Sequence, residues 1–189
     1  MKVIGINGSA RKDGNTAILI NTVFKELEAE GIETELIQLS GTNLKGCMAC
    51  YKCKETKNNT CVIKDELNGY IEKLLDADGI ILGSPVYFAD VSTEMKAFID
   101  RVGVVSRANG NILKRKVGTA LTAVRRAGML RALDTMNHFF QINEMYIASS
   151  NYWNHGIGGA IGAVEEDVEG LETMKILGQN MAHIVKKLK

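Results

Sequence analysis

Two hydrophobic patterns alternate along the whole chain, and this alternation leaves few folds open. Short apolar runs such as KVIGI at 2–6 and GIILG at 79–83 are typical of buried strands. Longer segments, whose apolar residues recur at helical spacing, separate these runs. Strands are expected at 2–6, 34–38, 79–83, 116–124 and 145–148, and helices at 16–30, 67–75, 93–104, 129–142 and 164–188.

Strands that alternate with helices form parallel sheets, because each helix carries the chain back to start the next strand. The five strands and five helices predict an α/β fold. The expected form is a flavodoxin-like doubly wound five-stranded parallel sheet of order 2-1-3-4-5, in a three-layer αβα sandwich. The length suits a single domain over 1–189, with a cysteine-rich insert at about 45–64. Ligands of such sheets bind beyond the carboxyl ends of the strands, so the loops at 7–15, 84–91 and 124–128 should build any site.

The loop after the first strand, NGSARKDGNT, has the composition of an anion-binding turn. It matches neither G-x-x-x-x-G-K-[ST] nor G-x-G-x-x-G, so it does not predict a triphosphate or dinucleotide site. A helix starting there would offer free N–H groups and a positive dipole end to one terminal phosphate. The candidate residues are Ser9, Arg11, Gly14, Asn15 and Thr16. The alternative is a simple helix cap formed by Asn15 or Thr16.

The two later loops offer a surface for a planar ring and additional positive charge. Pro85 is the only proline and stiffens the second loop. Val86, Tyr87 and Phe88 follow it with apolar surface on which a ring would stack, unless these aromatic side chains simply close the core. Arg125 follows the fourth strand. It is a candidate for binding a cofactor phosphate or, alternatively, a solvated charge near a helix start.

All the cysteines lie in one short segment, GCMACYKCKETKNNTC, as Cys47, Cys50, Cys53 and Cys61. Their C-x2-C-x2-C-x7-C spacing brings the thiols within reach of one metal centre, and thiolates bind zinc and iron–sulfur clusters. The spacing favours a [4Fe–4S] cluster, although the fourth cysteine lies farther off than in the bacterial ferredoxin run. A zinc site, a disulfide framework and free or redox-active thiols are the alternatives.

Charge and composition narrow the classes of partner. A net charge of +1 argues against a nucleic-acid binder that depends on a basic field. We see no secretory signal and no apolar run of the roughly eighteen residues that a membrane span needs. We therefore expect a cytoplasmic protein with neither nucleic-acid nor membrane partners. The glycine-rich stretch SSNYWNHGIGGAIG at 149–162 is expected to be a mobile loop that caps a site, reaches a partner subunit or stays on the surface.

In the segments GSARKDGNT, GSPVYFADVSTEMKAFIDR and AVRRAG, the chain resembles the NADPH-dependent FMN reductases of the flavodoxin-like fold. In its cysteine motif it resembles the iron–sulfur flavoproteins within that branch. The resemblance implies that the polar residues of the first loop hold the FMN phosphate. It also implies that residues 85–88 line the flavin ring and that the four cysteines hold the cluster. A homodimer or homotetramer is implied as well, in which the cluster of one protomer serves the flavin of another.

The expected function is a flavin-dependent oxidoreductase that passes electrons between FMN and a [4Fe–4S] cluster. NADPH or NADH is the expected donor, and a small molecule or a protein such as ferredoxin exchanges electrons with the cluster. Because the cofactors carry this chemistry, no catalytic acid or base is expected. One alternative is a cluster-free NAD(P)H-dependent FMN or quinone reductase with free or zinc-binding cysteines. Another is a non-catalytic electron carrier or zinc-stabilised module.

Overall fold

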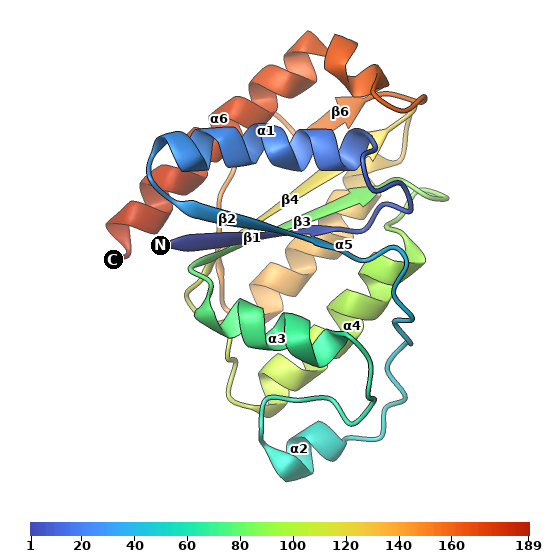
Figure 1. The fold of residues 1–189 in the computed structure, drawn as a ribbon, viewed down its shortest axis with the longest axis vertical. Helices are drawn as coiled ribbons and strands as arrows, with labels where there is room; N and C mark the ends of the chain where they lie inside the picture. The colour runs from blue at the N-terminus through green and yellow to red at the C-terminus, as the bar shows by residue number, and fades with distance from the viewer.

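The computed structural model describes residues 1–189 and contains one sheet with helices on both faces (Figure 1). Its strands are β1 (Lys2–Asn7), β2 (Glu33–Gln38), β3 (Gly79–Pro85), β4 (Val117–Val124), β5 (Tyr146–Ile147) and β6 (His155–Ile157). Their order is β2-β1-β3-β4-β5, β6 also pairs with β4, and all pairings between these strands are parallel. The predicted flavodoxin-like doubly wound order is confirmed.

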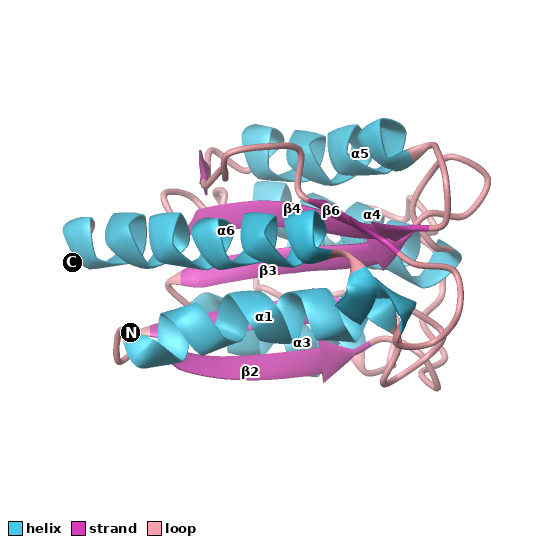
Figure 2. Ribbon diagram, turned by 90° about the horizontal axis from the view of Figure 1, so that it is seen from above, coloured by secondary structure: helices cyan, strands magenta, loops and turns pink.

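Helices cover the sheet in two layers, as the view from above shows (Figure 2). Helices α1 (Asn15–Ala29) and α6 (Val168–Lys187) pack on one face, and α3 (Leu67–Asp76), α4 (Thr93–Ala108) and α5 (Met129–Ile142) pack on the other. The short helix α2 (Lys52–Thr56) lies against α4, and a 3-10 turn, η1 (Ala163–Glu166), precedes α6. None of the helices is both long and apolar enough to cross a membrane.

Burial explains why the central strands appear in the sequence as continuous apolar runs. Every residue of β4 is buried, because helices cover both faces of the sheet. Glycines let these helices pack closely on the strands. A Cβ on Gly5 would lie 2.7 Å from the Phe24 ring of α1, and one on Gly118 would lie 2.4 Å from the Phe140 ring of α5. Helix and strand therefore meet where no larger residue fits.

The fifth strand differs from the prediction. Of the expected strand at 145–148, only β5 forms, beside Val117 and Gly118, and β6 takes over beside the far end of β4. Between them, Asn154 replaces strand pairing with a side-chain contact, since its Nδ2 donates to the Ala120 carbonyl at 3.0 Å. The intervening residues are thereby free to leave the sheet, and the strand is split.

Two helical segments also differ from the prediction. The expected helix at 164–188 begins only at Val168, because the Asp167 carboxylate accepts the Gly170 N–H at 3.0 Å and caps the helix there. The residues before it form η1 instead. Helix α2, inside the cysteine segment, was not predicted, since its five residues are too few to show a helical apolar pattern.

One serine ties the second loop to the first at the carboxyl ends of the strands. The Ser92 hydroxyl caps α4 by accepting the Met95 N–H at 3.2 Å, and it donates to the Gly8 carbonyl at 2.6 Å. The Ser92 N–H in turn donates to the Ser84 hydroxyl at 3.0 Å. The start of α4 is therefore held against the ends of β1 and β3, where ligands of this fold bind.

Candidate functional site

The first candidate site is a pocket beyond the carboxyl ends of β1, β3 and β4, which we call the strand-end pocket. Most of the predicted cofactor-binding residues line it together. Its lining residues are Ser9, Arg11, Asn15, Thr16, Pro85, Val86, Tyr87, Ala123, Arg125, Gly158 and Gly159. The structure thus brings all three predicted loops to one place and adds the glycine-rich stretch before η1.

The start of α1 forms the wall of this pocket that is best suited to an anion. Gly14 occupies the N-cap position and no side chain caps the helix, so the first backbone N–H groups lack intrahelical partners. The Thr16 side chain is buried, and its Oγ1 has no hydrogen-bond partner in the protein. Leaving a buried hydroxyl unpaired costs about 1–3 kcal/mol. An acceptor such as a phosphate oxygen would satisfy it, so this wall fits the phosphate of FMN.

Polar side chains at the ends of β1 and β2 brace the first loop. The Ser9 N–H donates to Asn7 Oδ1 at 3.0 Å, and Gln38 Nε2 donates to the Ser9 carbonyl at 2.7 Å. The Ser9 hydroxyl accepts the Arg11 N–H at 3.1 Å, which turns the loop toward α1. Asn7 and Gln38 were not predicted to serve the site. Their hydrogen bonds fix the backbone of the first loop at Ser9.

Asn15 has a structural task that the sequence did not reveal. Its Nδ2 donates to the carbonyls of Gly158 and Ala160, at 2.9 and 2.8 Å. These two bonds fasten the glycine-rich stretch across the start of α1. A Cβ on Gly158 would lie 2.6 Å from the Val164 nitrogen, so only glycine fits this approach. The stretch therefore forms part of the wall of the strand-end pocket, and its role as a cap stays a prediction.

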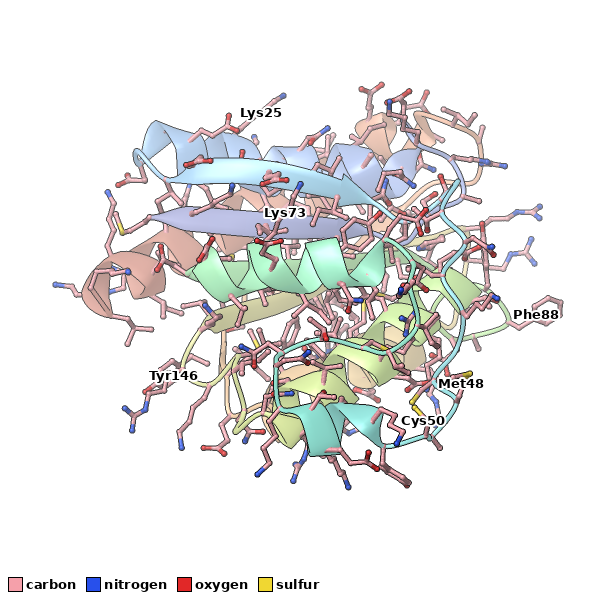
Figure 3. The ribbon with its side chains drawn as sticks, turned by 60° about the horizontal axis from the view of Figure 1, so that its bottom comes forward. Lys25, Met48, Cys50, Lys73, Phe88 and Tyr146 are labelled. Carbon is pink, nitrogen blue, oxygen red and sulfur yellow. The ribbon has the colours of Figure 1, made fainter.

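The second loop contributes only part of its predicted aromatic surface. Tyr87 and Asp90 close a tight turn through mutual backbone bonds of 2.8 and 3.0 Å. Phe88 and Ala89, at the tip of this turn, have left-handed backbone with φ of 48° and 60°. Phe88 is fully exposed and projects outward (Figure 3), and it does not line the strand-end pocket. Its assignment to the flavin ring stays a prediction, as do those of the other pocket residues.

Arg125 supplies positive charge to the strand-end pocket. A Cβ on Gly159 would lie 3.3 Å from Arg125 Cγ, so the arginine stem packs along the glycine-rich stretch. Arg11 contacts the same stretch, with its Nη1 3.4 Å from the Gly159 carbonyl. Two arginines thus line a pocket that also contains buried polar groups and the apolar surface of Val86 and Tyr87. Such a pocket can bind a phosphate linked to a flat apolar ring.

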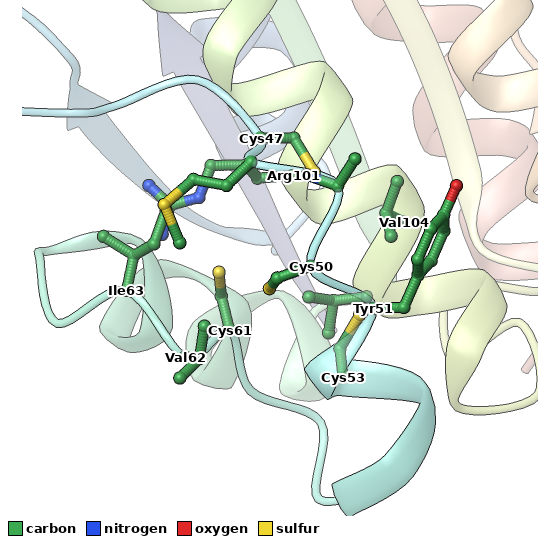
Figure 4. A pocket seen from close by; sticks show the side chains of 12 residues that line it. Cys47, Cys50, Tyr51, Cys53, Cys61, Val62, Ile63, Arg101 and Val104 are labelled. Carbon is green, nitrogen blue, oxygen red and sulfur yellow. The ribbon is translucent and has the colours of Figure 1, made fainter.

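The second candidate site is the cysteine pocket, a hollow between the cysteine segment and α4 (Figure 4). Its lining residues are Cys47, Met48, Ala49, Cys50, Tyr51, Cys53, Cys61, Val62, Ile63, Arg101, Val104 and Val105. All four cysteines are therefore brought together, and none forms a disulfide. The disulfide framework considered from the sequence does not form.

The cysteines differ in burial, and they are not arranged as a finished metal site. Cys53 is buried, Cys61 is half-buried, and Cys47 and Cys50 are exposed. No group of three or more cysteine, histidine or carboxylate side chains has metal-binding geometry. Burial raises the pKa of the Cys53 thiol, and the neighbouring cysteines raise it further. A metal bound there would have to displace a proton from this thiol.

The backbone of the segment folds back between successive cysteines. Ala49 and Tyr51 both have left-handed backbone, with φ of 52° and 55°, which is uncommon for residues other than glycine. These turns direct Cys47, Cys50 and Cys53 to one hollow although they are only three residues apart in sequence. The donor set is all sulfur, which suits soft metals and iron–sulfur clusters.

Helix α4 connects the two candidate sites, which share no lining residue. Ser92, before its first turn, contacts Gly8 in the first loop, whereas Arg101 and Val105 line the cysteine pocket. At 1.5 Å per residue, Arg101 lies about 14 Å along the axis from Ser92. Within one chain, the cysteines therefore lie farther along α4 and not directly beside the strand-end pocket.

Comparisons with known proteins agree with this geometry. The family model described as NADPH-dependent FMN reductase matches residues 1–159. An iron–sulfur flavoprotein of Methanocaldococcus jannaschii is 40% identical over 196 residues, covering all of both chains. Another, of Methanosarcina thermophila, is 30% identical over 98% of this chain and 96% of its own.

Solved structures show the same fold at lower identity. RosB, solved with a bound intermediate named 8-demethyl-8-formylriboflavin-5'-phosphate, matches with a TM-score of 0.78 at 17% identity, over 100% of this chain and 80% of its own. A flavodoxin, the WrbA-like protein of Agrobacterium tumefaciens, matches with a TM-score of 0.69 at 18% identity, over 100% and 98%. Loop sequences, fold and relatives agree that the chain belongs to the NADPH-dependent FMN reductase family, as an FMN-binding oxidoreductase of flavodoxin-like fold.

Proposed function

We propose that this flavin-dependent oxidoreductase passes electrons between FMN in the strand-end pocket and a [4Fe–4S] cluster in the cysteine pocket. The observation that carries the proposal is the convergence of the only four cysteines of the chain on one hollow. The relatives that align over nearly its whole length are named iron–sulfur flavoproteins, which supports the same assignment.

The strand-end pocket would hold FMN by its phosphate and by its ring. The start of α1, Thr16, Ser9 and Arg11 would bind the phosphate, with charge-assisted hydrogen bonds from the guanidinium. Pro85, Val86 and Tyr87 would lie against the ring, and Arg125 would face it. Bound FMN supplies two-electron chemistry with a nicotinamide and one-electron chemistry with a metal centre.

The cysteine pocket would hold the cluster through Cys47, Cys50, Cys53 and Cys61 as thiolates. The left-handed turns at 49 and 51 bring the first three to one hollow, and the half-buried Cys61 lines it from the other arm of the segment. A small closure of the exposed arm, which carries Cys47 and Cys50, would complete the ligand set.

The proposed cofactors also indicate an electron donor for the flavin and partners for the cluster. NADPH or NADH would reduce the flavin, and a small molecule or a protein such as ferredoxin would exchange electrons at the cluster. The segment that carries the cysteines also has five exposed lysines, of which Lys52 pairs with Glu55, and this excess of positive charge would favour an acidic protein there: Lys45, Lys52, Lys54, Lys57 and Lys64. A homodimer or homotetramer would bring the cysteine pocket of one protomer toward the strand-end pocket of another, across the distance that α4 imposes within one chain.

Purification without oxygen tests the proposal, with flavin, iron and zinc measured on the same sample. We expect the absorption spectrum to show flavin peaks and a broad band at about 400 nm. The iron content should be about four atoms per chain. Cys50→Ala should lose the iron and keep FMN, whereas the control Met48→Leu, in the same pocket, should keep both. Flavin without iron would refute the cluster and favour the cluster-free NAD(P)H-dependent FMN or quinone reductase, with zinc content separating zinc-bound from free cysteines.

A further inference from the structure

A buried arginine forms part of the wall of the cysteine pocket. Arg101 comes from α4, and its side chain is only 1% exposed although arginine is rarely buried unless it is paired. In Figure 4 it reaches from the helix toward the side of the pocket where Cys61 and Ile63 lie. A fixed positive charge therefore stands directly against the only group of thiols in the chain.

The terminal nitrogens of Arg101 hold both ends of the cysteine segment. Its Nη1 and Nη2 form a two-point ion pair with the Asp65 carboxylate, which follows Cys61, and the Nη2 contact measures 2.9 Å. Nη1 also donates to the Lys45 carbonyl, just before Cys47, at 3.2 Å. The guanidinium is thereby fixed in one orientation, as bidentate arginine pairs are.

The remaining nitrogen, Nε, is buried and has no acceptor in the protein. A buried donor of a charged group that lacks a partner is costly, so its persistence calls for an acceptor that the protein alone does not supply. Apart from the cysteines and Tyr51, the side chains that line this pocket with Arg101 lack oxygen and nitrogen, and Tyr51 lies on the far side of the pocket from Cys61 and Ile63 (Figure 4). Sulfur is therefore the acceptor that the pocket offers.

The position of Cys61 points to the same sulfur atoms. Cys61 lines the same pocket as Arg101 and lies on the side toward which the arginine reaches. A cation and an N–H donor next to the sulfur atoms of a cluster favour its reduced form, because reduction adds negative charge. Outer groups that hydrogen-bond to ligands tune metal centres in this way.

We infer that Arg101 tunes the cluster site, donating its Nε–H to sulfur at or beside Cys61 and raising the reduction potential of the cluster. The inference rests on the proposed function, since it requires a cluster in the cysteine pocket. Asp65 is the positioning residue: it orients the guanidinium so that Nε faces the sulfur atoms. The bonds to Asp65 and Lys45 also hold the two ends of the cysteine segment together. Arg101 therefore shapes the pocket and sets the reduction potential of the cluster.

Reduction potentials of cluster and flavin, measured by separate spectroscopic titrations, test the inference together with iron content. The key variant is Asp65→Asn/Arg101→Gln, which removes the charge pair without leaving a lone buried carboxylate. We expect it to retain iron and to shift the one-electron reduction equilibrium of the cluster at least tenfold toward the oxidised form, or about 59 mV. The FMN potential should stay unchanged. Asp65→Asn alone keeps the Nε–H and the positive charge, and its amide oxygen can still accept from the guanidinium and hold its orientation, so it should not lower the cluster potential.

Other outcomes would overturn the inference. An iron-loaded double variant with the wild-type cluster potential would show that Arg101 does not act on the cluster. Equal shifts of the flavin and cluster potentials would indicate a general change of fold. Iron loss from the double variant and also from Arg101→Lys would reduce Arg101 to a structural clamp. Wild-type protein without iron would instead refute the proposed function itself, and the tuning role with it.

Discussion

Replacing Thr16 by valine should move two properties of the protein in opposite directions. Valine keeps the shape of threonine and removes the buried hydroxyl that has no partner. In the flavin-free protein, losing an unsatisfied buried polar group should stabilise the fold by about 1–3 kcal/mol. For a domain of this size that corresponds to a rise in Tm of about 2–12 °C. FMN affinity should fall by one charge-assisted bond, about 1.5–3 kcal/mol, or roughly ten- to 150-fold in Kd.

Two measurements on flavin-free protein check this prediction: thermal unfolding followed by circular dichroism, and titration with FMN followed by flavin fluorescence. Thr119→Val is the matched control, because the Thr119 hydroxyl is equally buried but already donates to the Ala148 carbonyl at 2.9 Å. The control should be less stable than wild type and bind FMN normally. A Thr16→Val protein that is destabilised and keeps its FMN affinity would show that the hydroxyl does not serve a phosphate.

Three further changes probe the site and the frame around it. Arg11→Ala should weaken FMN binding by about 1.5–3 kcal/mol, measured by the same titration, and an unchanged Kd would argue against the first loop as the phosphate site. Gly158→Ala should lower both FMN affinity and Tm, because its Cβ would lie 2.9 Å from Asn15 Nδ2 and push the glycine-rich stretch away. Normal values for both would show that this stretch does not shape the pocket. Burial raises the pKa of the Asp78 carboxyl, but Lys189 and the Lys2 N–H together hold that pKa below its ordinary value. The ionised carboxylate therefore stabilises the fold at neutral pH, and this stabilisation is lost as pH falls through the lowered pKa. Asp78→Asn should therefore flatten the loss of stability on acidification below about pH 5. An unchanged pH dependence of the free energy of unfolding, measured with urea, would contradict this.

The sequence predicts the sheet well, because the burial that stabilises the central strands also produces the apolar runs from which they are predicted. The runs that become β1, β3 and β4 are mostly apolar because helices bury both faces, and that burial is visible in the composition. The split of the fifth strand is invisible for the opposite reason. Asn154 replaces a backbone bond with a side-chain bond, and no hydrophobic pattern records that exchange.

The predicted site was incomplete where function depends on distant partners. Phe88 is apolar and follows Pro85, yet a left-handed backbone turns it out to solvent. Arg101 looks like one more charge on an amphipathic helix, because its partner Asp65 lies 36 residues away in the chain. Only the folded structure shows that this arginine is buried among thiols. The sequence identified which residues converge, but not how each side chain is used.

The split edge of the sheet also bears on how the protein avoids aggregation. A long exposed edge strand presents a row of free N–H and C=O groups that can pair with another chain. Here the edge beside β4 consists of the two-residue β5 and the three-residue β6, with an irregular stretch between them. The Ile157 N–H in β6 is also occupied by Asp167 at 2.6 Å. No continuous template is left along this edge, so pairing of another chain with it is disfavoured.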